Sequence, residues 1–168
     1  MEFCYPVNII NIRQEKTSSH LGLDLGFDSS IDKNSYNQDI INPFKGEVIY
    51  IKYQATGGYV IHIYSKELNL TSEFGHLKKG SIKVKLHQIV ESGEVIAKMG
   101  NSGKASGYHL HYGLYKGKLN YNKKSFSKAS IVKDYKLYNG DIVPLYEVDG
   151  KFALIDKVRG YYTSKNYL

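Results

Sequence analysis

The stretch HLGLDLGF, residues 20–27, alternates polar or small residues with apolar ones. His20, Gly22, Asp24 and Gly26 alternate with three leucines and a phenylalanine. Because successive side chains of a β-strand point to opposite faces, this period of two predicts a half-buried strand. The same geometry puts His20 and Asp24 on one polar face. This predicted strand therefore supplies candidate functional side chains as well as part of the fold.

Further strand-like runs follow along the chain, and no stretch has a helical period. GEVIYIKY, GYVIHIYS and LTSEFGHL are rich in Val, Ile, Tyr and Phe, and Gly-bearing connections separate them from IVESGEVIAKMG and GYHLHYGLY. We therefore expect a mainly β fold, with an antiparallel sheet or barrel-sandwich-like main domain that carries a groove. A small C-terminal β segment completes the predicted architecture.

The composition changes near residue 117, where KGKLNYNKKSFSKAS is rich in Lys, Asn and Ser. A chain of 168 residues can hold one domain and a small module. We therefore divide it into a main domain at residues 1–122 and a linker with a small β segment at residues 123–168. Within that segment Asp149 and Gly150 form a tight hairpin signal.

Charge and cysteine content narrow the classes of function. The net charge of +7 favours anionic partners, but the lysines are spread along the chain, so we expect no nucleic-acid partner. Cys4 is the single cysteine, which excludes an internal disulfide. No apolar run reaches the roughly 20 residues of a membrane span, and MEFCYPVNII does not resemble a secretory signal. We expect a monomer that is a phage-encoded lysin, a tail-associated protein, or a mature or excised fragment.

Histidines supply the strongest functional signal. His109 and His111 stand one residue apart in a predicted strand, so both imidazoles point to the same side. Together with His20 and Asp24 they offer nitrogen and oxygen ligands of the kind that bind zinc. His76 lies at the end of another predicted strand, whereas His62 and His87 are interpreted as ordinary structural or surface residues.

These motifs resemble those of the lysostaphin-type zinc endopeptidases, which cut peptide cross-links in bacterial peptidoglycan. The matching segments are HLGLDLG, FGHL and GNSGKASGYHLHYGLY. The resemblance implies that residues 1–122 are a zinc endopeptidase catalytic domain, in which His20, Asp24 and His111 bind one zinc ion per chain. It assigns His76 and His109 to catalysis, with His109 expected as the base and His76 as the group that stabilises the oxyanion.

The resemblance also implies a place of action and a partner. We expect hydrolysis of cross-links or stem peptides at the bacterial cell wall, with peptidoglycan as the partner. Three features depart from the family: Phe74 replaces a tyrosine, Tyr108 replaces a proline or small residue, and the loop from Asp28 to Asn42 is long. We expect that loop to form one rim of the groove, and Tyr108 and Tyr112 to line it.

Other hypotheses stay open at this point. A non-catalytic wall-binding or activator protein of the same fold is the main alternative. VESGEVIAKMG also resembles part of lipoyl-like and sugar-phosphotransfer carrier domains, and a basic nucleic-acid binder is a third class. The C-terminal segment, ending in GYYTSKNYL, resembles a bacterial Src-homology-3-like module of the kind that tethers wall hydrolases.

Overall fold

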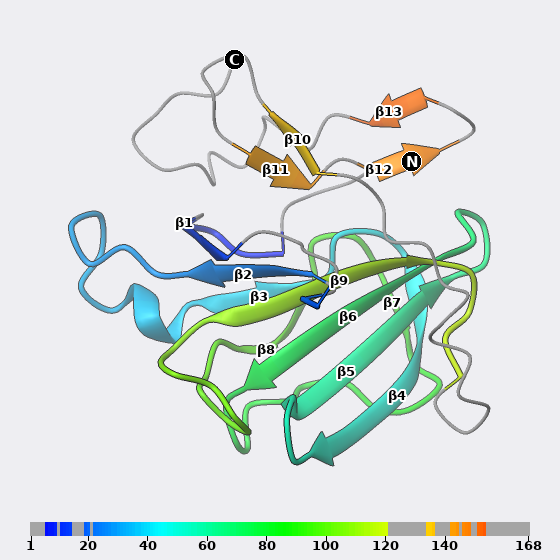
Figure 1. The fold of residues 1–168 in the computed structure, drawn as a ribbon. Helices are drawn as coiled ribbons and strands as arrows, with labels where there is room; N and C mark the ends of the chain where they lie inside the picture. The colour runs from blue at the N-terminus through cyan, green and yellow to red at the C-terminus, as the bar shows by residue number, and fades with distance from the viewer. Residues whose placement is uncertain are drawn as a thin grey trace.

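A computed structural model describes residues 6–9, 11–14, 19–20 and 22–120, and the backbone of four short strands beyond them. One antiparallel sheet dominates this part of the chain (Figure 1), in the order β1-β2-β9-β6-β5-β4-β7. Its strands are β1 (Asn11–Gln14), β2 (Leu23–Gly26), β9 (Leu110–Lys116), β6 (Leu70–Leu77), β5 (Gly58–Ser65), β4 (Gly46–Gln54) and β7 (Ile89–Val90). The mainly β, antiparallel prediction is confirmed, and the sheet is open, with β1 and β7 at its edges.

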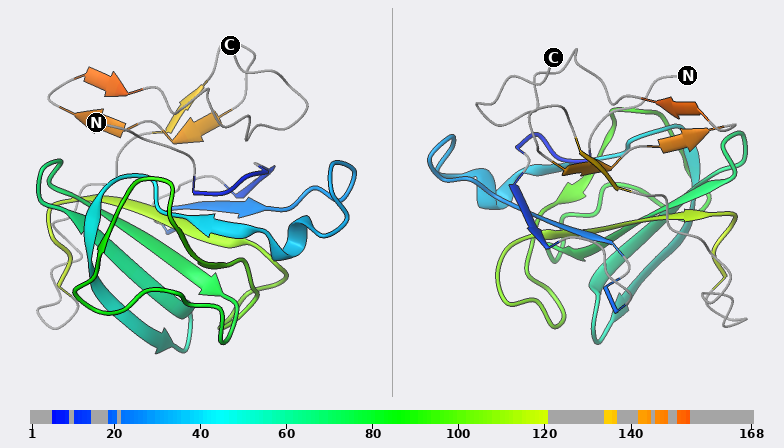
Figure 2. Two further views of the ribbon diagram at one scale, coloured as in Figure 1. Left: turned by 180° about the vertical axis from the view of Figure 1, so that it is seen from behind. Right: turned by 45° about the horizontal axis from the view of Figure 1, so that its top comes forward.

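A second, two-stranded sheet pairs β3 (Asp39–Ile41) with β8 (Val95–Lys98). The chain between β6 and β8 crosses one face of the large sheet, as the view from behind shows (Figure 2). The buried core lies on this side, because the core cluster joins Val84 of the crossing segment and Ile96 of β8 to residues of the large sheet. The opposite face of the large sheet is thereby left to carry polar side chains.

Alternation within the strands separates these two faces. In β9, Leu110, Tyr112 and Leu114 are buried in the core, so His111 and Tyr115 point the other way. The hydroxyl of Tyr112 lies 3.1 Å from that of Ser72, inside the protein. The expectation that Tyr112 lines a groove was therefore wrong, because its place in the alternation puts its ring in the core.

Two further expectations need correction. The predicted strand at residues 20–27 is shorter, since β2 begins at Leu23 and His20 precedes it. The predicted loop from Asp28 to Asn42 contains a short 3-10 helix, η1 (Ser35–Asn37), and the whole of β3. Pairing with β8 creates β3, and a partner strand that is distant in sequence is invisible to local periodicity.

The C-terminal strands are described by their backbone alone. β10 (Asp134–Lys136) pairs with β11 (Ile142–Pro144), and β12 (Tyr146–Val148) pairs with β13 (Lys151–Ala153). Val148 pairs with Lys151 around the two predicted turn residues, which themselves lie outside the described residues, as does the linker expected after residue 122. No helix among the described residues has both the length and the apolar character needed to cross a membrane.

Candidate metal and catalytic site

Three predicted ligands meet on the polar face of the large sheet. His20 Nε2 lies 3.0 Å from Asp24 Oδ1 and 3.2 Å from His111 Nδ1, and the latter two atoms are 3.1 Å apart. Their side chains are only 14% to 19% exposed. Among the described residues this is the one group of at least three His, Cys, Asp or Glu side chains with metal-site spacing.

Strand pairing explains why residues so distant in sequence meet. Asp24 and His111 are direct partners in the β2–β9 ladder, so their side chains leave the sheet on the same face. His20 reaches the pair from just before β2. Gly22 leaves the space that the ligands need, since a Cβ there would lie 2.6 Å from Tyr112 O and 3.0 Å from the His111 ring.

The donor set fits a zinc ion. Zinc bonds to nitrogen and oxygen are about 2.0–2.2 Å long, and tetrahedral angles then separate ligand atoms by roughly 3.3 Å. The three atoms of the triangle are separated by 3.0–3.2 Å, close to that value. Three protein ligands would leave one tetrahedral position for water or substrate, as in catalytic rather than structural zinc sites.

The two predicted catalytic histidines flank this triangle. The His76 and His109 rings are 4.6 Å apart, and His109 Nε2 lies 3.6 Å from Asp24 Oδ2. The Nδ1 atom of His76 lies 2.8 Å from Ser102 O, and that of His109 lies 2.9 Å from Gly107 O. Since a carbonyl only accepts, each Nδ1 carries a hydrogen and each Nε2 is presented to the site.

The backbone around His76 has an unusual shape. Between the pairs Tyr59–Leu77 and Ile61–Phe74, β6 has one more residue than β5, which makes a β-bulge. His76 has a φ of +58°, a left-handed conformation that residues other than glycine seldom adopt. Its backbone N–H donates to Gly57 O over 2.7 Å, which holds the bulge in place.

The surroundings of His111 and His76 shift the pKa values of these two histidines in opposite directions. Burial opposes the charge of His111, but hydrogen bonds with Asp24 and Glu73 and the charges of these carboxylates outweigh it and raise the His111 pKa to about 9. Burial also acts to raise the pKa of Asp24, yet the hydrogen bond with His111 and the nearby histidines lower it overall. Burial lowers the pKa of His76, and the hydrogen bond to Ser102 only partly offsets this effect.

A groove of about 430 Å³ runs along the site. His20, His76 and His111 line it together with Gln54, Thr56 and Lys104. Among the described residues that line this groove, none comes from the 28–42 segment, so the rim expected from that segment is not found. Tyr36 of the segment instead meets Tyr108 edge to face, with ring centroids 5.2 Å apart, and both side chains are about 40% exposed. Tyr108 therefore packs on the long loop and is not among the residues that line the groove.

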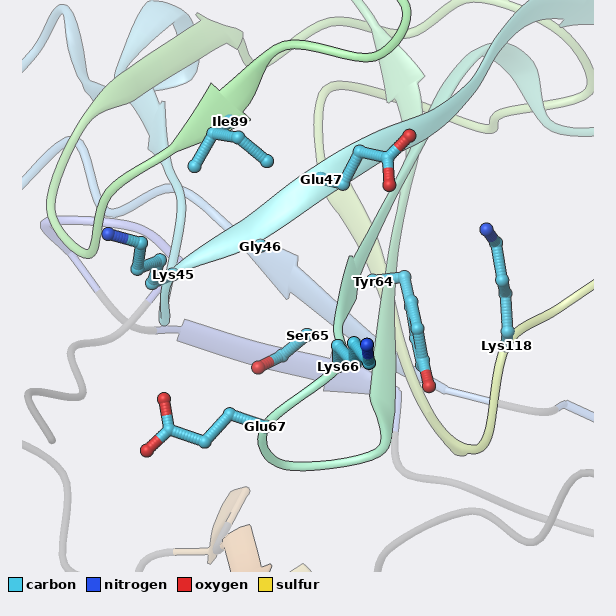
Figure 3. Close-up of a pocket in the computed structure, with 9 residues that line it drawn as sticks. All are labelled: Lys45, Gly46, Glu47, Tyr64, Ser65, Lys66, Glu67, Ile89 and Lys118. Carbon is cyan, nitrogen blue, oxygen red and sulfur yellow. The ribbon is translucent and has the colours of Figure 1, made fainter.

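A second hollow, of about 360 Å³, lies at the opposite ends of β4 and β5 (Figure 3). It is lined by three lysines, two glutamates and Tyr64, with Ile89 on one side, and it contains no histidine. Glu47 and Lys45 are engaged with His87 and Glu91. Among the described residues, the candidate metal ligands therefore lie at the histidine site and not in this hollow.

Sequence reasoning missed two polar groups at the site. Glu73 Oε1 lies 3.5 Å from His111 Nε2, and the Tyr115 hydroxyl donates to the same oxygen over 3.3 Å. His62, interpreted from sequence as an ordinary residue, lies 2.7 Å from Glu73 Oε2 and is fully buried. The available signal was alternation in LTSEFGHL, where Glu73 shares a strand face with Gly75 and precedes His76 by three residues.

Comparison with known proteins agrees with this geometry. The family model of peptidase family M23 matches residues 18–124. Over 89 residues the chain is 36% identical to an uncharacterized metalloprotease of Haemophilus influenzae, which covers 52% of this chain and 17% of that relative. The chain thus spans less than a fifth of the length of that relative.

Solved structures share the fold. A Pseudomonas aeruginosa protein assigned to the M23 peptidases has 29% identity and a TM-score of 0.53, covering 66% of this chain and 43% of its own. A zinc-containing peptidase of Vibrio cholerae has 22% identity and a TM-score of 0.55, covering 68% and 36%. The catalytic domain of lysostaphin from Staphylococcus simulans has 17% identity and a TM-score of 0.55, covering 73% and 84%.

Proposed function

The chain belongs to peptidase family M23, and from this premise we propose that it is a zinc-dependent endopeptidase that hydrolyses peptide cross-links or stem peptides of bacterial peptidoglycan. The observation that carries the proposal is the triangle of His20 Nε2, Asp24 Oδ1 and His111 Nδ1, with two further histidines beside it. Zinc is supported by this donor set and by the zinc-containing peptidase of Vibrio cholerae. The wall substrate is supported by likeness to lysostaphin, an antimicrobial peptidase.

His20, Asp24 and His111 are the residues that would hold the metal. A bound zinc ion would act as a Lewis acid, polarising the scissile carbonyl and making a water molecule acidic enough to attack near neutral pH. The protein must then accept a proton from that water and deliver one to the leaving amine.

His76 and His109 are placed for both proton transfers, because each presents Nε2 to the site. The lowered pKa of His76 favours its neutral form, which accepts a proton, and so supports His76 as the base. His109 Nε2 lies 3.6 Å from Asp24 Oδ2, beside the triangle, where this imidazole would be the group that donates to the oxyanion or the amine. This division reverses the roles expected from sequence, while the reaction class is unchanged.

The groove gives an extended peptide access to these groups. Lys104 is an exposed cation among its lining residues and would attract the carboxylates of stem peptides. We place this activity at the bacterial cell wall, as that of a monomer. A wall-binding role for residues 123–168 and a phage source stay predictions.

The proposal is tested by incubating purified peptidoglycan with the protein, with and without a chelator, and identifying the released amino termini by mass spectrometry. Wild type should release new termini only without chelator. His111→Ala should lose both zinc and activity, and His76→Ala should lose activity but keep zinc. His87→Ala is the matched control, because its side chain is 74% exposed and it lies outside the groove.

Two results would contradict the proposal. If wild type, His76→Ala and His111→Ala released the same products, the histidines would not catalyse the reaction. If none released products while wild type bound peptidoglycan and contained no zinc, the non-catalytic wall-binding alternative would replace the enzyme.

A further inference from the structure

Three polar residues and a glycine form a row across four neighbouring strands beside the metal triangle. Tyr50 of β4 pairs with His62 of β5, His62 with Glu73 of β6, and Glu73 with Gly113 of β9 (Figure 1). Direct partners point to the same face of a sheet, so this row shares the face of His111. It lies one step along the sheet from the row formed by Asp24, His111 and Gly75.

Glu73 is held from several directions. His62 Nε2 lies 2.7 Å from its Oε2, and the Tyr115 hydroxyl donates to its Oε1 over 3.3 Å. The His62 ring is itself stacked on Tyr50, with centroids 4.7 Å apart and planes 21° apart. A buried carboxylate is costly unless it is hydrogen-bonded, so these contacts fix where the charge stands.

Gly113 contributes by having no side chain. A Cβ at this position would lie 2.7 Å from Cε2 and 3.1 Å from the hydroxyl of Tyr115. The Tyr115 ring therefore lies over Gly113, where its hydroxyl can reach Glu73. The side chains around Glu73 form one packed arrangement.

The held carboxylate faces the metal ligand. Oε1 of Glu73 lies 3.5 Å from Nε2 of His111, while Nδ1 of the same ring faces Asp24 Oδ1 and His20 Nε2. One imidazole therefore connects the triangle on one side to the carboxylate on the other. Carboxylates in this relation to a metal-binding histidine fix its tautomer and the orientation of its ring.

We propose that Glu73 is the positioning residue for His111, accepting the Nε2 hydrogen so that the Nδ1 lone pair is directed at the metal. This inference rests on the zinc site of the proposed function and adds Glu73 and His62, which lie outside the motifs found in the sequence, and Tyr115, to which those motifs gave no role. Tyr115 and His62 hold Glu73 in place. They therefore act on the metal only indirectly, through Glu73 and His111.

The test measures the dissociation constant for zinc itself, by competition with a chelator of known affinity. Glu73→Gln keeps the size of the side chain and removes its charge, and should weaken zinc binding about 10–100-fold. Tyr115→Phe should weaken it less, since Glu73 keeps its contact with His62. Ser72→Ala is the matched control: it removes a buried hydrogen bond from the same strand on the opposite face, and should leave zinc affinity within about twofold.

A second readout works on the wild type alone and so does not depend on whether variants fold. Nitrogen-15 spectra of the zinc-loaded protein should show the His111 hydrogen on Nε2 and the metal on Nδ1. Metal on Nε2 would overturn the proposal, as would equal zinc affinities of Glu73→Gln and Ser72→Ala. Failure of wild type to bind zinc would instead overturn the proposed function, so the two failures are distinct.

Discussion

Zinc binding should release a proton from His111, because the metal and the proton compete for Nδ1. The metal-free site raises the His111 pKa to about 9, since the hydrogen bonds and charges of Asp24 and Glu73 outweigh the effect of burial. At pH 7 about 1% of His111 is neutral, and at pH 9 about half is. The apparent association constant for zinc should therefore rise about 50-fold between these pH values.

Calorimetry measures this release directly. Titration of zinc into the metal-free protein at pH 7.5, in buffers with different enthalpies of ionisation, should give at least one proton released per zinc, one from His111 and a further fraction from a metal-bound water that ionises near neutral pH. Asp24 contributes none in this range, since its pKa is lowered from an already acidic value. His76→Ala should release the same number, because the His76 pKa is also lowered. Zinc affinity that is constant from pH 7 to pH 9, with no proton released, would refute the reasoning.

Three further changes have defined consequences. His109→Ala should lower kcat by about 10²–10⁴-fold while zinc content is unchanged; loss of zinc, measured by elemental analysis, would contradict its position beside the triangle. Gly100→Ala should lower the free energy of unfolding by about 1–3 kcal/mol, because its Cβ would lie 2.5 Å from Lys78 N and 2.8 Å from His76 O; chemical denaturation measures this, and a wild-type midpoint would contradict it. Asn42→Ala should cost roughly 1–3 kcal/mol in the same assay, since its buried amide donates to the carbonyls of Phe44, Val90 and Glu91; an unchanged midpoint would show that these carbonyls find other donors.

Period-two patterns made much of the fold predictable. GEVIYIKY, GYVIHIYS and LTSEFGHL correspond to β4, β5 and β6, which are neighbours in the sheet, and GYHLHYGLY contains β9. Local patterns succeed here because one face of the sheet is buried. They fail for β3, which depends on β8 for its pairing. The burial of Tyr112, by contrast, follows from the alternation within β9, which puts its ring on the face opposite to His111.

The sequence motifs named the four histidines and the aspartate of the candidate site, but not the carboxylate or the backbone bulge that position them. Five motif residues were named from sequence, and the structure brings all of them together. Glu73 was missed because its role depends on the register of β6 against β9, which places it beside His111 without any motif spacing. The bulge at His76 was missed for the same reason, since the extra residue is defined only by comparison with β5.

The most direct test of a metal-dependent peptidase is to restore zinc stepwise to the metal-free protein while following the release of amino termini from peptidoglycan. Activity should be absent at the start, rise in proportion to added zinc, and reach its maximum at one equivalent per chain. Full activity before any metal is added, or no activity after one equivalent is bound, would contradict the account.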